Sequence, residues 1–218
     1  MPRINPQSVR LVDAFKIRHT IDPDFAMFHG HSTAINKYYM PKYYIPLGEW
    51  WLDVRLKEEK DFLMRLEAVE RPKNIKQGLE AKKYIAGKML KKGTIPNFVI
   101  KKEWHLGYHL VMVDGAVVRG YIDPEFTQGG HEVVYPYIPG GEVWIEKALH
   151  PKEVPFVLQH EVLERKLMLK GKSYDVAHEY AIVSEKEMRR AHGGFYPLDE
   201  KYPWGKLTDD QIRKKYYV

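Results

Sequence analysis

Cysteine is absent from this chain of 218 residues, and several familiar functional elements are missing as well. Without cysteine there are no disulfides, no thiolate metal sites and no cysteine nucleophile, so any metal must be held by histidine and carboxylate side chains. No apolar run reaches the roughly eighteen residues of a membrane span, and residues 1–10 lack an apolar signal core. There is no Gly-rich phosphate loop and no Gly-x-Ser-x-Gly element. We therefore expect a cytoplasmic, intracellular protein without a membrane partner.

Apolar residues make up 44% of the chain and aromatic residues 13%, which is ample for a packed core. The formal net charge is +6, which favours contact with anions such as nucleic acid. Lysine and arginine are spread along the whole sequence, however, so most of them are expected to form a solvated surface.

The sequence His160-Glu161-Val162-Leu163-Glu164 places two metal-binding side chains four residues apart. On a helix this spacing puts both on one face. Zincin-type hydrolases use the same geometry, with two ligands at i and i+4 and a carboxylate at i+1 that activates the metal-bound water. We predict that His160 and Glu164 hold Zn²⁺ together with His178 from the next helix, and that Glu161 is the catalytic general base.

A structural interpretation of the same residues stays open. His-Glu also occurs at residues 131–132 and 178–179, and a charged surface helix produces the pattern by accident. His160 and His178 would then be core histidines, with one of them bonded to Glu185. In the metal interpretation Glu185 supports His178 from behind, and Arg165 orients Glu164 or meets a substrate carboxylate.

His131 follows two glycines, Gly129 and Gly130, that indicate a tight turn or a close backbone approach. The residue is a candidate further ligand or substrate-binding group. A loop histidine without function is the simpler interpretation.

Three blocks of the first half recur in the second half in the same order. Residues 12–25 match 113–126 at an offset of 101, as from Arg18 to Arg119. Residues 44–52 match 137–145 at an offset of 93, and residues 62–71 match 156–165 at an offset of 94. We infer two tandem pseudo-repeats, in which Leu66 corresponds to His160 and Lys82 to His178. The second repeat would carry the site, and the first would be degenerate, with Leu66 buried on the apolar face of its helix.

Strands followed by a helix pair, twice over, predict an α+β fold. The expected domains are residues 1–93, residues 94–192 with the site, and a C-terminal extension of residues 193–218. Alternating apolar residues between Ser8 and Phe25 indicate strands, and residues 44–52 indicate a further strand. Helices are expected over residues 57–70 and 75–90, and Asp114-Gly115 suggests a tight hairpin joining residues 109–113 to 116–122.

The region around the candidate site contains further local signals. Pro151, Pro155 and Glu153 suit the first turn of a helix, while Gly171 and Ser173 suit the end of that helix and the start of the next. Residues 142–145 form a strand before the helix pair, where an extended peptide could bind by strand addition, although a core strand is the simpler interpretation. The basic and aromatic residues 212–218 could touch nucleic acid, but a solvated helix end explains them equally.

The segment of about residues 105–190 resembles a family of uncharacterised phage and microbial proteins with a zincin-like helix pair. The resemblance rests on Arg119, Asp123, Phe126, Gly129-Gly130-His131, Tyr135-Pro136, Glu142-Val143-Trp144-Ile145, His160-Glu161, Glu164-Arg165, Gly171, Tyr174 and Ala177-His178. It brings no activity with it. Similarity to proven zinc peptidases is confined to His160 and Glu161, since Glu164 stands where those enzymes have a second histidine.

Two functions follow from these observations. The first is a zinc-dependent hydrolase, a metallopeptidase acting on a peptide or protein. The second is a non-catalytic viral or archaeal binding protein that contacts nucleic acid or a protein partner, with the polar helix pair as a structural element.

Overall fold

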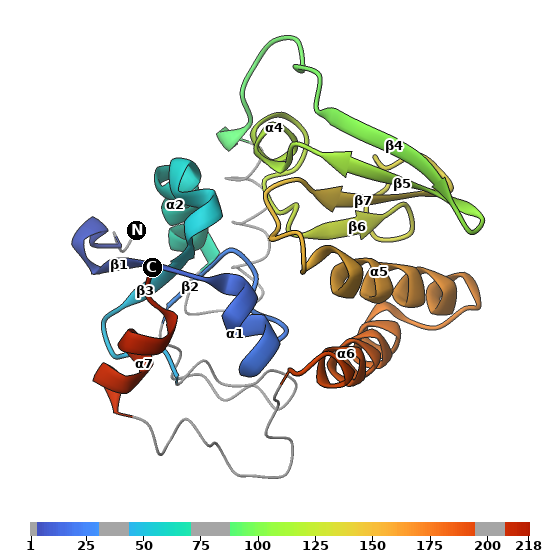
Figure 1. Cartoon of the computed structure of the whole chain (residues 1–218). Coiled ribbons are helices and arrows are strands. Elements are labelled where there is room, and N and C mark those ends of the chain that lie inside the picture. Colours follow the sequence, from blue (N-terminus) through green and yellow to red (C-terminus); the bar gives the residue numbers. More distant parts are fainter. Residues whose placement is uncertain (1–3, 31–43, 71–87, 195–207) are drawn as a thin grey trace. The chain divides into compact units, whose positions relative to one another are not determined.

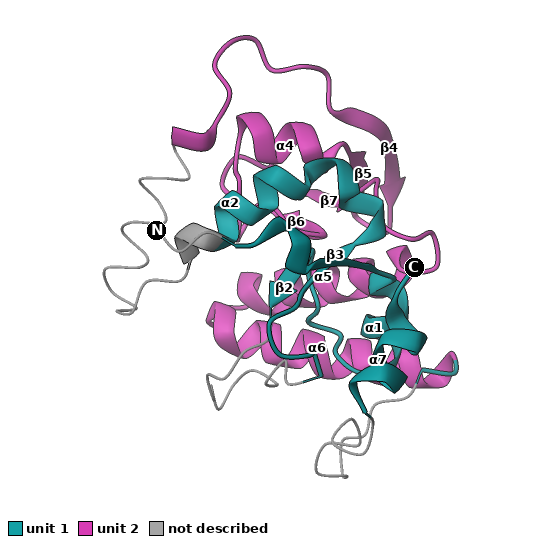
Figure 2. Cartoon of the chain, turned by 90° about the vertical axis from the view of Figure 1, so that its left-hand side faces the viewer, with its two compact units in different colours: residues 1–78, 193–218 teal, residues 79–192 magenta. Residues whose placement is uncertain are grey.

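The computed structural model describes residues 4–30, 44–70, 88–194 and 208–218. The described chain is α+β, as predicted, with helices and two small sheets (Figure 1). It divides into two compact units, one formed by Met1–Gly78 with Gly193–Val218 and the other by Leu79–His192 (Figure 2). The C-terminal residues therefore belong to the first unit, whereas the sequence predicted a separate extension of residues 193–218.

The first unit contains a three-stranded sheet in the order β1-β3-β2. Strand β1 (Val9–Val12) runs parallel to β3 (Trp50–Asp53), and β2 (Phe28–Gly30) runs antiparallel to β3. A 3₁₀ turn (Pro6–Ser8) precedes β1, helix α1 (Ala14–Thr20) follows it, and a second 3₁₀ segment (Val54–Glu59) leads from β3 into helix α2 (Lys60–Glu70). Helix α7 (Asp209–Tyr216) completes the described part of this unit.

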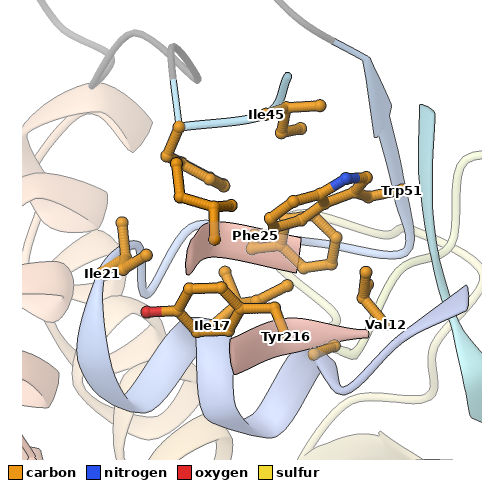
Figure 3. Packing of buried hydrophobic residues seen from close by; sticks show 10 residues of the cluster. Val12, Ile17, Ile21, Phe25, Ile45, Trp51 and Tyr216 are labelled. Atoms are coloured by element: carbon orange, nitrogen blue, oxygen red, sulfur yellow. The ribbon is translucent and has the colours of Figure 1, made fainter. Parts of the chain in front are cut away.

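The core of the first unit joins residues from both ends of the chain. Trp51 lies at its centre and packs against the rings of Tyr44 and Tyr216 (Figure 3). Ile212 and Tyr216 of α7 are buried in this core, whereas Lys214, Lys215 and Val218 are exposed, so residues 212–218 form a solvated helix end on one side only. Leu66 of α2 is buried, as predicted. Its expected neighbour, the helix at residues 75–90, lies outside the described residues except for its last three positions.

The second unit contains a four-stranded sheet in the order β4-β5-β7-β6. Strand β5 (Tyr108–Val113) pairs with β4 (Val99–His105) in antiparallel and with β7 (Glu142–Glu146) in parallel fashion, and β6 (Gly129–His131) runs antiparallel to β7. Helix α4 (Gly115–Tyr121) follows β5. Helices α5 (Val154–Leu169) and α6 (Tyr174–Ala191) form the helix pair, and α5 packs against β6 and β7.

The helix pair matches the predicted ends in part, because α5 begins at Val154, which leaves Pro151 before the helix and makes Glu153 its N-cap. Pro155 lies in the first turn of α5, where its missing N–H costs no hydrogen bond. Gly171 directly follows the helix end with a φ of 86°, a conformation that glycine adopts without strain. Ser173 stands at the N-cap of α6 with Asp175 in the first turn. The short connection makes the two helices neighbours.

Both units pair their strands in equivalent register. Val12 lies opposite Asp53 in the first unit, and Val113 lies opposite Glu146 in the second. Gly30 lies opposite Trp50, and His131 lies opposite Val143. These matches keep the offsets of 101 and 93 found in the sequence, as from Val12 to Val113 and from Asp53 to Glu146. The agreement supports the inferred repeat and assigns Gly30 as the counterpart of His131.

A buried arginine holds the same loop in each unit. Arg18 Nη1 donates to the carbonyl oxygens of Phe25 and Ala26, at 2.9 and 3.2 Å. Its counterpart Arg119 donates to Phe126 and Thr127, at 3.2 and 3.5 Å. Both arginines are fully buried, so their charges require nearby carboxylates. In the second unit Arg119 Nη2 lies 2.9 Å from Glu146 Oε2.

The C-terminal segment pairs with the end of β1 in the first unit, as the start of β4 pairs with the end of β5 in the second. The N–H of Asp13 donates to Tyr216, and Val12 bridges Tyr217 in antiparallel fashion. At the equivalent place in the second unit, the N–H of Asp114 donates to Phe98, and Val99 pairs with Val113. A strand position that precedes β5 along the chain in one unit is thus filled from the far end of the chain in the other.

Two local predictions were wrong for the same reason. Asp114-Gly115 does not form a hairpin, because Asp114 is the N-cap of α4 and its side chain accepts from the N–H of Ala116. Asp13 caps α1 in the same way, so residues 14–20 are helical rather than a strand. An aspartate before a small residue suits both a tight turn and a helix start, and the sequence alone did not separate the two. The strand predicted over residues 44–52 is limited to residues 50–53.

Among the described residues, no helix is both long and apolar enough to cross a membrane.

Candidate metal centre

Three elements of the second unit contribute the side chains of the candidate site. Helix α5 carries His160, Glu161 and Glu164 within about one turn, so all three leave neighbouring positions of its surface. Helix α6 contributes His178 from its second turn and β6 contributes His131 from its last position. The sequence predicted the helix residues to converge, and the structure brings them together.

The three predicted metal ligands form a compact triangle of atoms. His178 Nδ1 lies 2.8 Å from Glu164 Oε2 and 3.1 Å from His160 Nε2. The third side, from His160 Nε2 to Glu164 Oε2, is 3.5 Å. His160 and Glu164 are buried, whereas His178 is half-buried, so the triangle is accessible from the side of α6.

These separations fit a small divalent cation. A tetrahedral Zn²⁺ site has ligands at about 2.0–2.2 Å, which places ligand atoms about 3.3–3.6 Å apart. The observed distances of 2.8 to 3.5 Å are therefore within a few tenths of an ångström of that geometry. Three ligands would leave a fourth position open, as catalytic sites require. Two imidazoles and a carboxylate are donors that Zn²⁺ accepts well.

Glu185 fixes the ring of His160. Its Oε2 lies 2.9 Å from His160 Nδ1, and an ionised carboxylate only accepts, so Nδ1 is the protonated nitrogen of this pair. Nε2 therefore faces Glu164 and His178, the orientation found in metal-binding histidines whose other nitrogen is bonded to a carboxylate. In the metal interpretation the sequence assigned Glu185 to His178, which was wrong. The helix pair places Glu185 against His160, one turn before Glu164 on α5.

A buried charge network continues behind Glu185. Arg189 donates from Nε to Glu185 Oε1 at 2.8 Å, and its guanidinium also pairs with Glu153. The ring of Phe156 lies 4.4 Å below the Arg189 guanidinium carbon. Arg189 and Glu153 are fully buried. Glu153 was expected at a helix start for its charge alone, and its pairing with Arg189 was not predicted.

His131 holds the other oxygen of Glu164. The backbone N–H of Val133 donates to His131 Nδ1 at 3.3 Å, which leaves the proton on Nε2. The Nε2–H of His131 donates to Glu164 Oε1 at 3.1 Å, and Glu164 Oε2 remains directed at the two helix histidines. His131 is thus a fully buried strand residue that orients Glu164, not a loop histidine without a partner.

A second group of potential ligands contains His131, Glu161 and Glu164, whose donor atoms lie within 4.8 Å of one another. Of the two groups, the one formed by His160, Glu164 and His178 fits a metal better. In the second group the lone pair of His131 is on Nδ1 and is occupied by the N–H of Val133, so its Nε2 cannot serve as a ligand without rearrangement.

Glu161 lies beside the triangle and under a glycine. A Cβ added to Gly129 would be 3.0 Å from Glu161 Cγ and 3.1 Å from its Oε1, so the missing side chain of Gly129 makes room for this carboxylate. Within the described residues the Glu161 carboxylate makes no hydrogen bond. Burial raises the pKa of Glu161 to about 8, and the neighbouring carboxylates of Glu164 and Glu185 act in the same direction against the opposing charge of His160.

The titration of the other two groups reflects their mutual contacts. Hydrogen bonds to Glu164 and Glu185 outweigh the burial of His160 and raise the pKa of its imidazole to about 10. Hydrogen bonds from the three histidines outweigh the burial of Glu164 and hold the pKa of its carboxyl well below the ordinary value. Without a metal the site is therefore a protonated imidazole embedded among carboxylates.

Arg165 has a different partner from the one predicted. Its guanidinium forms a bidentate pair with Glu132, with Nε to Oε2 at 2.8 Å, and does not orient Glu164. Glu132 also accepts from the N–H of Gly141 at 3.1 Å. The pair ties α5 to the residue after His131, so Arg165 stabilises the strand end that presents His131.

The strand at residues 142–145 is not available for strand addition. It is β7, which pairs with β5 on one side and β6 on the other. An extended peptide would have to use an outer strand of this sheet, and β6, which ends at His131, is the outer strand nearest the site.

No protein-family model, curated protein or solved structure matches this chain. The resemblance to phage and microbial proteins with a zincin-like helix pair accordingly stays a prediction.

Proposed function

We propose that the chain is a zinc-dependent hydrolase whose ligands are His160 Nε2, Glu164 Oε2 and His178 Nδ1. The observation that carries the proposal is the convergence of these three atoms within 2.8–3.5 Å of one another. Two orienting contacts support it, one from Glu185 to His160 and one from His131 to Glu164. Ligands held by such contacts are typical of metal sites.

A bound Zn²⁺ would lower the pKa of a water molecule in its open position and polarise a substrate carbonyl. Glu161 takes the proton of the attacking water, because its carboxyl is next to the ligand triangle and makes no hydrogen bond to the described residues. Its pKa of about 8 lies close to neutrality, where a carboxylate can both accept a proton and return it to a leaving group. The cation itself would pull this pKa down toward the ionised form.

A peptide or protein is the substrate class that the surroundings favour. Among the described strands, β6 pairs with β7 only, but its three residues are buried and the His131 carbonyl accepts from the N–H groups of Val134 and Tyr135, so a peptide would have to displace this turn to reach the edge. An extended peptide can bind such an edge through main-chain hydrogen bonds. A carbonyl of a peptide bound along β6 would then face Glu161, because Glu161 lies against Gly129 of β6.

Metal analysis of protein purified without chelator tests the first half of the proposal. We expect one zinc per chain in the natural protein and loss of the metal in His160→Ala and His178→Ala. Exposed His192 is at the end of α6 outside the site, so His192→Ala is the matched control and should keep its zinc.

Hydrolysis of an unstructured protein substrate tests the second half. Glu161→Gln should keep the zinc and lose activity, since the amide retains the shape but accepts no proton. Loss of zinc in Glu161→Gln would contradict the role of general base, and full zinc content in His160→Ala would contradict the ligand set.

A binding protein with a polar helix seam is the second candidate. It is favoured by one observation, which is that Glu164 Oε2 can accept from both His160 and His178 without any metal. Purified protein that binds no zinc at any pH, yet unfolds more easily in His160→Ala, would support this candidate, with nucleic acid or a protein as partner.

A further inference from the structure

Strand β4 is an outer strand of the second unit's sheet and is open along its whole length. It pairs with β5 alone among the described strands, and all seven residues are exposed (Figure 1). Ile100 is 57% exposed and Trp104 68% exposed. Natural proteins usually protect such an edge by shortness, proline, cover, a bulge or charged side chains such as lysine, because it is a template for another strand, and β4 carries Lys101 and Lys102. A bulge at Val99/Lys101 limits the regular part of β4 to its later residues.

The free backbone groups of β4 follow from its turn. Leu106 and Gly107 form a two-residue turn with φ of 41° and 97°, so His105 and Tyr108 are the hydrogen-bonded pair that closes the hairpin. Pairs alternate between bonded and non-bonded along an antiparallel ladder. The N–H and C=O groups of Lys102 and Trp104 therefore point away from β5.

We propose that β4 pairs in antiparallel fashion with β4 of a second copy of this chain, about a two-fold axis at Lys102. In this register Lys101 lies opposite Glu103 of the second copy, and Trp104 lies next to its bulge residue Ile100. The symmetry repeats both contacts, as an isologous interface requires. The two sheets join into one of eight strands.

The charges of β4 match their own rotated copy. Lys101 Nζ is 2.5 Å from Glu103 Oε1 within one chain, so the two-fold axis brings together four charges of alternating sign on one face. Lys102 meets its own copy at the axis, but each Lys102 Nζ is already 2.6 Å from Glu142 Oε1 and is neutralised there. If the two-fold axis passed through another residue whose N–H and C=O point away from β5, Lys101 would no longer lie opposite Glu103 of the second copy.

The opposite face supplies the apolar contribution. Ile100 at the bulge and Trp104 near the turn are apolar side chains that lie near the ends of the paired segment. Both are exposed in the single chain, so pairing removes apolar surface from water twice over. The self-matching order Lys101, Lys102, Glu103 is what favours a second copy over an unrelated strand as the occupant.

Sedimentation equilibrium of the full chain over a wide concentration range tests the proposal. We expect a reversible dimer. Lys101→Glu and Glu103→Lys each place like charges opposite one another and should raise the dimer dissociation constant roughly tenfold or more. The double variant Lys101→Glu/Glu103→Lys restores opposite charges both within and between chains and should recover the dimer. Trp104→Lys should weaken it as the single charge variants do.

Zinc content and the far-ultraviolet circular dichroism of each variant give the folding control, since all three substituted positions are exposed. A natural protein that stays monomeric up to millimolar concentration would overturn the proposal. So would a dimer that survives both single charge variants and Trp104→Lys, because its interface would then lie elsewhere.

Discussion

The two units pair their strands in the same register but differ in the side chains beside β3 and β7. These side chains are aromatic in the first unit and polar in the second. In the second unit His131 and Gly129 of β6 face Glu164 and Glu161 of α5. By the strand register, the first unit has Gly30 and Phe28 at the matching places of β2. By the sequence offset, it has Leu66 in place of His160.

The substitutions in the first unit are correlated. Phe28 stacks on Trp50, with ring centroids 5.2 Å apart, and Trp50 occupies the register position of Val143. Gly30 has no Cβ because one would lie 2.9 Å from the ring of Trp50. An aromatic pair thus occupies the place where the other unit has Val143 and the glycine gap at Gly129. The counterpart of His178, Lys82, lies outside the described residues.

The comparison separates what the fold needs from what the site needs. Arg18 and Arg119, the capping aspartates Asp13 and Asp114, and the paired strands recur in both units, so they serve the frame. The site histidines occur in one unit only, whereas by the sequence offset Glu67 and Glu70 stand in the first unit where the second has Glu161 and Glu164. Buried charges cost stability unless they are paired, which makes an accidental cluster of this size improbable on energetic grounds.

The largest effect is expected from breaking the shared frame. Arg119→Met leaves the carbonyls of Phe126 and Thr127 without their donor and Glu146 without its charge partner, so the second unit should lose about 3–5 kcal/mol of stability. Arg18→Met should cost the first unit a similar amount. Urea unfolding monitored by hydrogen exchange in each unit measures both. A loss in one unit only would show that the two arginines are not equivalent.

Exchanging the residues that differ is expected to have the next largest effect. His160→Leu copies the first unit into the second and removes a metal ligand, so zinc affinity should fall by more than the roughly 10–100-fold typical of a lost supporting contact. Glu185→Gln retains an acceptor for His160 Nδ1 but not its charge, and should fall within that range. Competition with a zinc chelator measures both. Equal losses in the two variants would mean that His160 does not bind the metal.

Metal-free protein should become less stable as pH rises from 7 to 10. His160 has its pKa raised from 6.5 to about 10, so the stability it contributes is fully present below 6.5 and is lost as pH rises through 10. Glu161, raised from 4.5 to about 8, changes stability in the same direction up to pH 8. The combined loss should be about 2 kcal/mol or more. His160→Leu should flatten this dependence, and an unchanged slope in that variant would contradict the assignment.

Zinc affinity should move the opposite way over the same range. The metal has to displace the proton from His160, so binding strengthens as pH rises and releases protons to the buffer. Calorimetry in two buffers of different ionisation enthalpy counts those protons. Pairing the two pH profiles distinguishes a metal centre from a polar seam, for which only the stability profile exists.

The smallest effect is expected from the glycine gap. Gly129→Ala places a Cβ 3.0 Å from Glu161 Cγ and Val157 Cγ1, so Glu161 must shift by a few tenths of an ångström. We expect reduced activity with zinc retained and a stability loss of about 1 kcal/mol. Gly140→Ala, which meets nothing within 4 Å, is the control. Equal activity of the two variants would show that the position of Glu161 is not critical.

Local spacing in the sequence predicted the helix pair and the ligand triangle. His160 and Glu164 are one turn apart, and the short Gly171 connection returns α6 along α5, so their meeting with His178 needs no distant information. The contacts that the sequence did not predict join residues far apart along the chain. Glu132 with Arg165, Glu153 with Arg189 and Tyr216 with Asp13 depend on how elements pack. For His131 a signal was present in the sequence. The offset of 101 pairs it with Gly30, so this histidine, like His160, has no histidine counterpart in the first repeat.

The return of the chain's last described segment to the first sheet has a consequence for synthesis. Residues 209–217 close the core around Trp51, so the first unit cannot be completed until they have left the ribosome. The second unit, Leu79–His192, is continuous and emerges earlier as a whole. Domains usually fold in the order in which they are made. Here we expect the order to be reversed, with the second unit folding first and the apolar residues of β1 and α1 staying exposed until residues 209–217 emerge.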